Sequence, residues 1–65
     1  MDKIIARHRM RSVSGDLYLV NEFEDGAGHT RMELSDGSPV QYVRGALYRI
    51  ERNAVIIRLI GSDAN

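Results

Sequence analysis

The residues best suited to bind a ligand are three arginines that alternate near the start of the chain. Arg7, Arg9 and Arg11 are two positions apart, and alternate side chains of a β-strand share a face with a repeat of about 6–7 Å. This repeat is close to the phosphate spacing of a nucleic-acid strand, and guanidinium groups bind phosphate or carboxylate in a bidentate manner. In a hairpin Tyr18 would lie opposite, where a base could stack on its ring. These four residues form a candidate basic face.

A second candidate is an apolar segment near the C-terminus. Residues 54–60 are apolar except for Arg58. A strand of this composition is apolar on both faces, and a short chain has little material to cover both. Exposed apolar patches mark interfaces, and an unpaired strand edge can accept a partner strand. The candidate interface, with a protein partner or a second copy, comprises Val55, Ile56, Ile57 and Ile60.

The sequence gives little support for metal binding or catalysis. Only two histidines, His8 and His29, are present and cysteine is absent, whereas a metal site needs three or four ligands. We expect His8 to bond to a backbone carbonyl or to Asn21. Nucleophilic catalysis needs a serine or threonine with a base within reach, whereas the serines here fall in predicted turns or in the tail, which is their usual structural role. Glu22 and Glu24 share a strand face without the burial that acid–base catalysis uses. We therefore predict no enzyme activity and no catalytic, cofactor-binding or metal-binding residues.

The segment 26–31 begins like a dinucleotide-binding fingerprint. Gly26 and Gly28 have the required spacing, but Arg31 stands where the third glycine belongs and no helix follows. We interpret the segment as a flexible connection, and no cofactor is predicted.

Composition bounds the class of protein. The chain has 65 residues, of which 43% are hydrophobic and 28% charged, an ordinary composition for one small globular domain. No apolar run approaches the roughly 20 residues of a membrane span, and the start lacks the apolar stretch of a signal peptide. We therefore expect no membrane association, and the absence of cysteine agrees with a cytoplasmic location.

Charge is unevenly distributed although nine basic and nine acidic residues cancel. Residues 1–15 hold four basic side chains and one acidic, residues 16–36 one basic and six acidic, and residues 37–62 four basic and one acidic. Either these opposite blocks pair across neighbouring strands, or the two ends of the chain build a basic face. The zero net charge disfavours long-range attraction of nucleic acid.

Alternation of apolar and polar residues predicts the first hairpin. From Ile4 onward the pattern favours a strand over a short helix, the alternative for residues 3–12. A turn centred near Ser14-Gly15 would place Met10 opposite Leu19 and His8 opposite Asn21. In that register the side chains of residues 17, 19 and 23 face the core.

Further short strands follow at intervals of 8–12 residues. Asp36-Gly37 predicts a tight hairpin turn in which both central residues have positive φ. Pro39 should open the next strand, and Asn53 should take the left-handed conformation in a later turn. Residues 1–61 then form a single β domain, and residues 62–65 a frayed tail.

These elements predict an all-β fold. The arrangement is a small five- or six-stranded antiparallel meander, either an SH3-like or Sm-like barrel or an open twisted sheet that completes its core by dimerising. The expected function is a small non-enzymatic interaction module that binds protein, through self-association or a partner strand. The alternative is a small nucleic-acid-binding barrel that uses the arginine face.

Two segments carry a resemblance. Residues 14–23 (SGDLYLVNEF) and 34–40 (LSDGSPV) resemble a pattern of short bacterial proteins without an established function: Ser/Thr-Gly, a tyrosine and a glutamate-aromatic pair, then Leu-x-Asp-Gly-x-Pro-Val. The resemblance implies a bacterial source and no particular activity.

Overall fold

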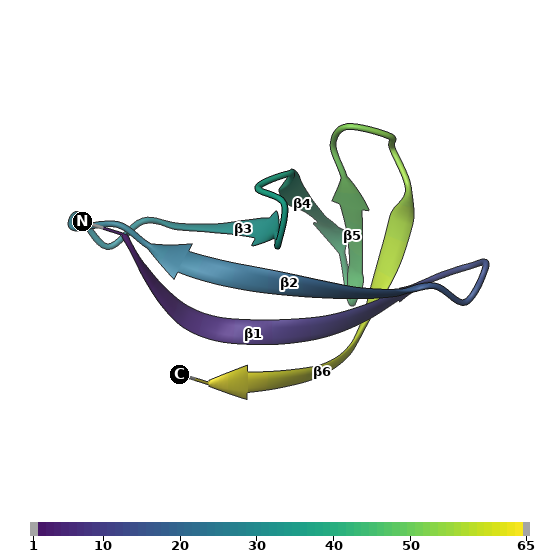
Figure 1. Cartoon of the computed structure of the whole chain (residues 1–65), viewed down its shortest axis with the longest axis horizontal. Coiled ribbons are helices and arrows are strands. Elements are labelled where there is room, and N and C mark those ends of the chain that lie inside the picture. The colour runs from purple at the N-terminus through teal and green to yellow at the C-terminus, as the bar shows by residue number, and fades with distance from the viewer. Residues whose placement is uncertain (1, 65) are drawn as a thin grey trace.

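The computed structural model describes residues 2–64 as six antiparallel strands that close into a small barrel (Figure 1). The strands are β1 (Lys3–Ser12), β2 (Leu17–Glu24), β3 (Thr30–Leu34), β4 (Pro39–Arg44), β5 (Leu47–Ile50) and β6 (Ile56–Ala64). Each strand pairs with the next, and β6 pairs with β1. The all-β prediction is confirmed, the architecture is consistent with an SH3-like or Sm-like barrel, and the first segment is a strand rather than a helix.

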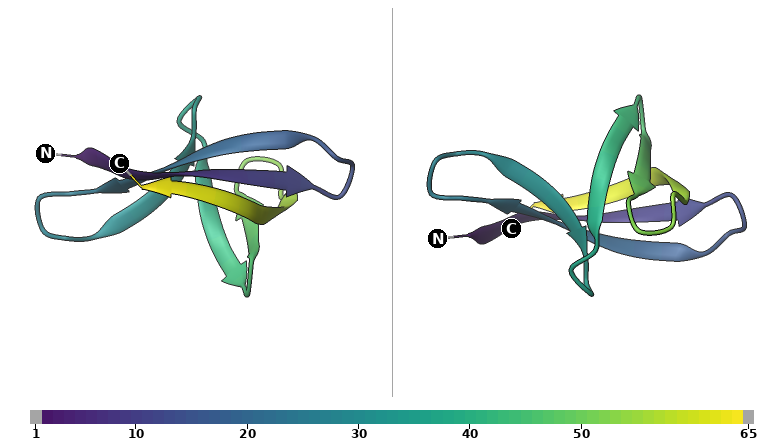
Figure 2. Two further views of the ribbon diagram at one scale, coloured as in Figure 1. Left: turned by 90° about the horizontal axis from the view of Figure 1, so that it is seen from below. Right: turned by 90° about the horizontal axis from the view of Figure 1, so that it is seen from above.

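The barrel has two unequal parts. Strands β1, β2 and β6 are long and run side by side, while the short β4 and β5 cross them at a steep angle (Figure 2). The β1–β2 register shifts between Ile4 and Ala6, and the β1–β6 register shifts between Arg9 and Met10. Such bulges bend a strand and increase its twist, which helps β1 to pair along both edges.

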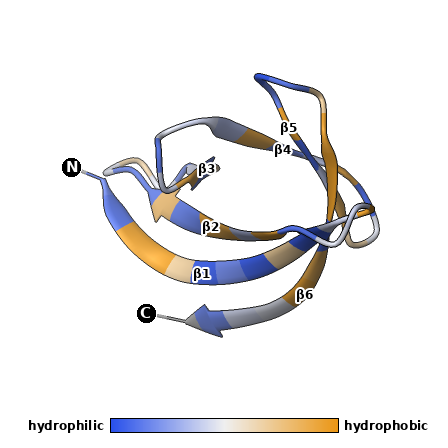
Figure 3. Ribbon diagram, turned by 45° about the vertical axis from the view of Figure 1, so that its right-hand side comes forward, coloured by the Kyte–Doolittle hydropathy of each residue, from blue (hydrophilic) through white to orange (hydrophobic). Residues whose placement is uncertain are grey.

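Every strand contributes one buried hydrophobic side chain to the core. These residues are Met10, Val20, Leu34, Val40, Ile50 and Ile57. The first part of β6 is hydrophobic and its end hydrophilic (Figure 3). A core this small makes each of its members important, because domains of this size gain only about 3–5 kcal/mol of net stability from burial.

The predicted register of the first hairpin is wrong by one residue. Met10 pairs with Tyr18, and His8 with Val20. Leu17 and Leu19 consequently lie 53% and 60% exposed on the outside, although the prediction placed them toward the core. A change of one residue in register turns every side chain of a strand to the other face.

The loop explains the error. Ser12 N–H donates to the Asp16 carbonyl (2.9 Å), and Gly15 N–H donates to the Ser12 carbonyl (3.0 Å). The loop therefore has three residues centred on Ser14, whereas a turn centred between Ser14 and Gly15 requires an even number. Gly15 closes the loop with φ 95°, the left-handed conformation that three-residue hairpin loops require at this position.

The same loop recurs in the next two hairpins. The hydrogen bonds of residues 25–29 and 34–38 repeat the pattern, with glycine again in the third loop position. Asp36-Gly37 is thus a turn as predicted but not of the predicted type, since Gly37 has positive φ (90°) and Asp36 does not. The Asp36 carboxylate accepts the Ser38 N–H (2.9 Å), and this bond, together with nearby Arg52, lowers the pKa of Asp36.

The last turn places an alanine in the conformation predicted for Asn53. Ala54 has φ 59°, and its N–H donates to the Ile50 carbonyl (2.9 Å). The Asn53 side chain instead accepts a hydrogen bond from the Val55 N–H (3.1 Å). Asn53 therefore stabilises the turn from the position that precedes Ala54. An L-residue in this left-handed region is strained by about 1–2 kcal/mol.

Replacing Ala54 with glycine should therefore stabilise the barrel. Relief of the strain exceeds the extra chain entropy of glycine, about 0.5–1 kcal/mol, so the free energy of unfolding rises by about 0.5 kcal/mol and the melting temperature by about 2–4 °C. Thermal denaturation followed by circular dichroism measures the change. The control is Ala27→Gly, at an exposed loop alanine outside the left-handed region, which should lower the melting temperature. A lower melting temperature for Ala54→Gly would contradict the strain argument.

The expected frayed tail is part of the sheet through Ala64. Ser62 pairs with His8, and Asp63 with Arg7, along the edge of β1. The strand therefore passes the predicted domain end at residue 61, because the long β1 offers a pairing edge there. Residue 65 lies outside the described residues.

Candidate functional site

The structure divides the candidate basic face. Arg7, Arg9 and Arg11 lie exposed on the outer side of β1 as predicted. Tyr18 does not join them, because it pairs with the buried Met10 and packs against the core. This correction follows from the register of the hairpin, and it removes the aromatic ring on which a base was expected to stack.

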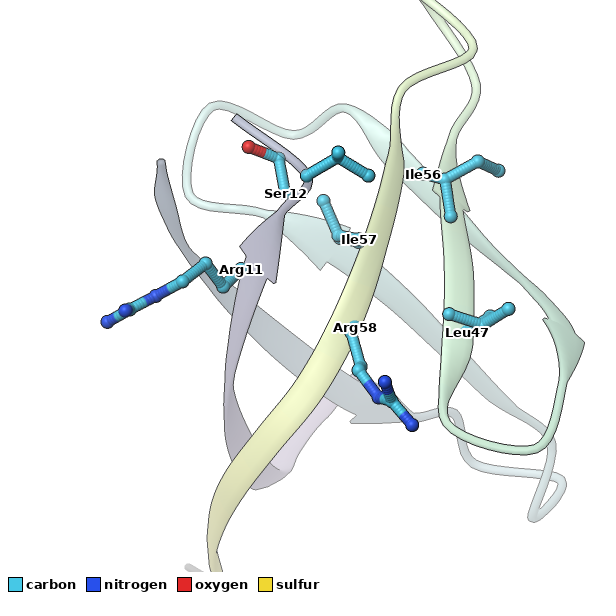
Figure 4. Close-up of a pocket in the computed structure, with 7 residues that line it drawn as sticks. Arg11, Ser12, Leu47, Ile56, Ile57 and Arg58 are labelled. Carbon is cyan, nitrogen blue, oxygen red and sulfur yellow. The ribbon is translucent and has the colours of Figure 1, made fainter. Parts of the chain in front are cut away.

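The arginines differ in their electrostatic partners. Arg9 Nη1 donates to Asp63 Oδ2 at 2.7 Å, and its side chain lies over Gly61, where an added Cβ would collide with the guanidinium group. Within residues 2–64, by contrast, no carboxylate lies within ion-pair distance of Arg7, Arg11 or Arg58. Arg11 and Arg58 are directly paired positions of β1 and β6, so two uncompensated cations lie on neighbouring strands, with their side chains pointing to opposite sides of β6 (Figure 4).

Other charges pair as the block pattern suggested. Arg52 binds Asp36 (2.7 Å), and Arg31 binds Asp2 (2.8 Å) and Glu33 (2.9 Å). Such exposed pairs contribute little to stability, and within the acidic block they neutralise Glu33 and Asp36. Among the described residues, Arg7, Arg11 and Arg58 on β1 and β6 have no carboxylate partner, and neither do Arg44 on β4 and Arg49 on β5.

One residue of the candidate interface, Ile57, does not lie on the surface. Ile57 is fully buried (0% exposed) and belongs to the core, and Val55 is half-buried against it. The prediction that Ile57 lies at an interface is wrong, because barrel closure covers the inner face of β6 with the chain's own strands. Ile56 (38% exposed) and Ile60 (52% exposed) remain available on the outside.

A groove brings together parts of both candidate sets. It has a volume of about 250 Å³ and is lined by Arg11, Ser12, Val13, Leu47, Ile56, Ile57 and Arg58. In Figure 4 the Ile56 and Leu47 side chains lie on the β5 side of β6, while Ser12 and Ile57 lie on the β1 side. Val13 is almost fully exposed. We call this the apolar groove; it has hydrophobic walls and carries the unpaired Arg11 and Arg58 at its sides.

The sequence prediction missed a partly buried hydrogen-bonded chain of three polar side chains, with the buried His8 at its centre. His8 Nε2 lies 2.9 Å from Glu22 Oε1, and His8 Nδ1 lies 2.6 Å from Ser62 Oγ. If Nε2 carries the proton, it donates to Glu22 while the Ser62 hydroxyl donates to Nδ1. His8 is 9% exposed, so both ring nitrogens need partners.

The predicted partner of His8, Asn21 or a backbone carbonyl, is therefore wrong. His8 and Glu22 point to the same side of the sheet because Glu22 pairs with Ala6, two positions from His8. The glycine in the third loop position is the signal that would have given this register. No comparable signal predicted the contact of Ser62 with His8, because Ser62 lies in the expected tail.

No family model, curated protein or solved structure matches this chain. Within residues 2–64 no cluster of three or more histidines or carboxylates is placed to hold a metal ion. The described residues also contain no helix long and apolar enough to cross a membrane.

Proposed function

We propose that this chain is a small non-enzymatic β-barrel module that binds a partner protein at the apolar groove. The observation that supports the proposal is the combination of hydrophobic walls, Val13, Leu47 and Ile56, with Arg11 and Arg58 beside them. Neither arginine has a carboxylate partner among the described residues. The partner segment should place an apolar side chain in the groove and a carboxylate on each side of it.

The character of the surrounding surface also favours a protein. Leu17 and Leu19 are exposed on β2 directly beside Arg11 and Arg9. Arginine combined with apolar side chains is typical of the centre of protein interfaces. A symmetric pair of two copies through this face would bring Arg11 and Arg58 of both copies together, and like charges oppose such contacts. Closure of the barrel pairs each strand with a neighbour on both sides, and the edge left for a partner strand lies mainly where β3 and β4 share only two paired positions.

The test uses fluorescein-labelled peptides of stated chemistry. A short peptide of alternating Glu and Leu should bind with a rise in fluorescence anisotropy, and peptides of alternating Lys and Leu or Glu and Ser should not. Arg58→Ser should weaken binding about tenfold, because it removes a charge-assisted hydrogen bond. Arg44→Ser, at an exposed arginine of β4, is the matched control. Equal binding of the Lys–Leu peptide, or unchanged affinity in Arg58→Ser, would refute the proposal.

Nucleic-acid binding is the second candidate, and the unpaired Arg7, Arg11 and Arg58 are the observation that favours it. Titration of labelled single-stranded RNA at low salt decides between the two, because displaced counterions make such binding strongly salt-dependent. RNA binding without Glu–Leu binding would replace the protein proposal. Light scattering after size exclusion detects self-association. If the protein forms a stable dimer and Ile60→Lys dissociates that dimer, self-association would replace the proposal of a partner protein.

A further inference from the structure

The barrel has a second groove where β3 and β4 separate. These strands share two paired positions, Met32 with Val40 and Glu33 with Pro39. The groove has a volume of about 230 Å³ and shares no residue with the apolar groove. Strands β2 to β5 all contribute to its lining, which is Glu22, Thr30, Arg31, Met32, Val40, Tyr42 and Tyr48.

An aromatic pair forms one side of this groove. Tyr42 and Tyr48 are paired positions of β4 and β5, and their rings meet edge to face with centroids 5.3 Å apart and an interplanar angle of 65°. Tyr42 is 62% exposed, so solvent and ligands can reach its ring. The face of an aromatic ring attracts cations through its quadrupole.

A fixed carboxylate supplies negative charge beside the rings. Glu22 is held by the hydrogen bond from His8, which is in turn held by Ser62. His8 contacts only Oε1, which leaves the second oxygen of Glu22 for a ligand. Burial raises the pKa of Tyr48, and the nearby Tyr42 hydroxyl and Glu22 carboxylate raise it further. Tyr48 is therefore neutral at physiological pH and can accept a hydrogen bond.

The one cation in the lining, Arg31, is already neutralised. Its guanidinium group donates to Asp2 and Glu33 and lies over the Phe23 ring, 4.9 Å from the centroid. The hydrogen bonds to Asp2 and Glu33 raise the pKa of Arg31 above its usual range. Arg31 thus leaves the charge of Glu22 uncompensated by any permanent cation that lines the groove.

We propose that this groove binds the guanidinium group of an arginine side chain from a partner chain, with Glu22 as the carboxylate acceptor and Tyr42 as the stacking ring. Guanidinium is favoured over other organic cations because its plane can stack on an aromatic face while its edge donates N–H groups to a carboxylate. A quaternary ammonium group has no N–H and would leave the second oxygen of Glu22 without a donor. This site is independent of the apolar groove and recognises the opposite charge.

The first experiment titrates the protein with N-acetyl-arginine N-methylamide and follows the ring resonances of Tyr42 and Tyr48 by NMR. A fragment of this size should bind with a dissociation constant on the order of millimolar. The matched ligand is the citrulline analogue, in which a neutral urea replaces guanidinium, and it should bind at least about tenfold more weakly because charge assistance is lost. Equal shifts for both ligands, or shifts at residues outside the groove, would overturn the proposal.

Variants test the two groups separately. Glu22→Gln keeps an oxygen that can accept the His8 proton but removes the charge, and should weaken arginine binding about tenfold. Tyr42→Leu removes the ring at a largely exposed position and should abolish the ligand-induced shift of the Tyr48 ring resonances with little loss of fold. The control is Glu24→Gln, at a carboxylate of the same strand that does not line the groove. Binding that survives Glu22→Gln and Tyr42→Leu unchanged would refute the site, whatever the result with the Glu–Leu peptide.

Discussion

Replacing Ile57 with lysine is expected to unfold the barrel, whereas the same replacement at Ile60 is expected to leave it folded. The two residues are close in β6, but Ile57 is fully buried and Ile60 is 52% exposed. A lysine at position 57 would place an ammonium group in the core without a partner, at a cost of several kcal/mol. A domain of this size has a net stability of about 3–5 kcal/mol to oppose that cost.

Circular dichroism melts and the dispersion of the methyl NMR signals measure the outcome. Ile57→Lys should show no cooperative melt, and Ile57→Ala should melt at a lower temperature because a cavity costs about 2–4 kcal/mol. Ile60→Lys should melt within a few degrees of the wild-type protein, about the scatter expected for surface substitutions. A cooperative melt of Ile57→Lys near the wild-type temperature would mean that the barrel does not close over β6.

Replacing His8 with alanine should cost about 2–3 kcal/mol of unfolding free energy. The substitution removes the centre of the chain from Glu22 through His8 to Ser62. It leaves a partly buried carboxylate without its donor, which costs about 1–3 kcal/mol, and it opens a cavity beside the core. His29→Ala is the matched control, because that side chain is 83% exposed and its loss should cost less than about 0.5 kcal/mol.

Urea denaturation of a double-mutant cycle isolates the interaction. His8→Ala and Glu22→Ala each remove the contact, and their effects should be non-additive by about 1 kcal/mol, the coupling expected for residues in direct contact. Losses that simply add, or a His8→Ala variant as stable as His29→Ala, would show that the contact does not support the fold.

Periodicity predicted the strands well but not which side of them faces inward. Strands β1 to β5 follow segments in which apolar and polar residues alternate at least in part, and glycine lies in every turn except the one between β5 and β6. Strand β2, however, carries large apolar residues on both faces, with Leu17 and Leu19 on one and Tyr18 and Val20 on the other. Hydropathy alone cannot show which of the two faces of β2 points to the core. That orientation depends on whether the β1–β2 loop has an odd or an even number of residues.

The candidate site was predicted in part for the same reason. Residues 54–60 show no alternation, so nothing local distinguishes the buried Ile57 from the exposed Ile56. The arginines were placed correctly because polar residues alternate clearly with apolar ones in β1. Ser62 and the Tyr42–Tyr48 pair depend on contacts between strands, which no short window of sequence contains.

The limited pairing of β3 with β4 has a consequence for the motions of the barrel. Elsewhere around the ring neighbouring strands share three or more paired positions, but these two share only two. Sub-global opening begins where the fewest hydrogen bonds must break. The barrel should therefore open first between β3 and β4, which we call the seam. In this opening the β4–β5 hairpin would move outward as a unit while the β1–β2–β6 layer stays intact. A ligand that spans the seam would quench that motion.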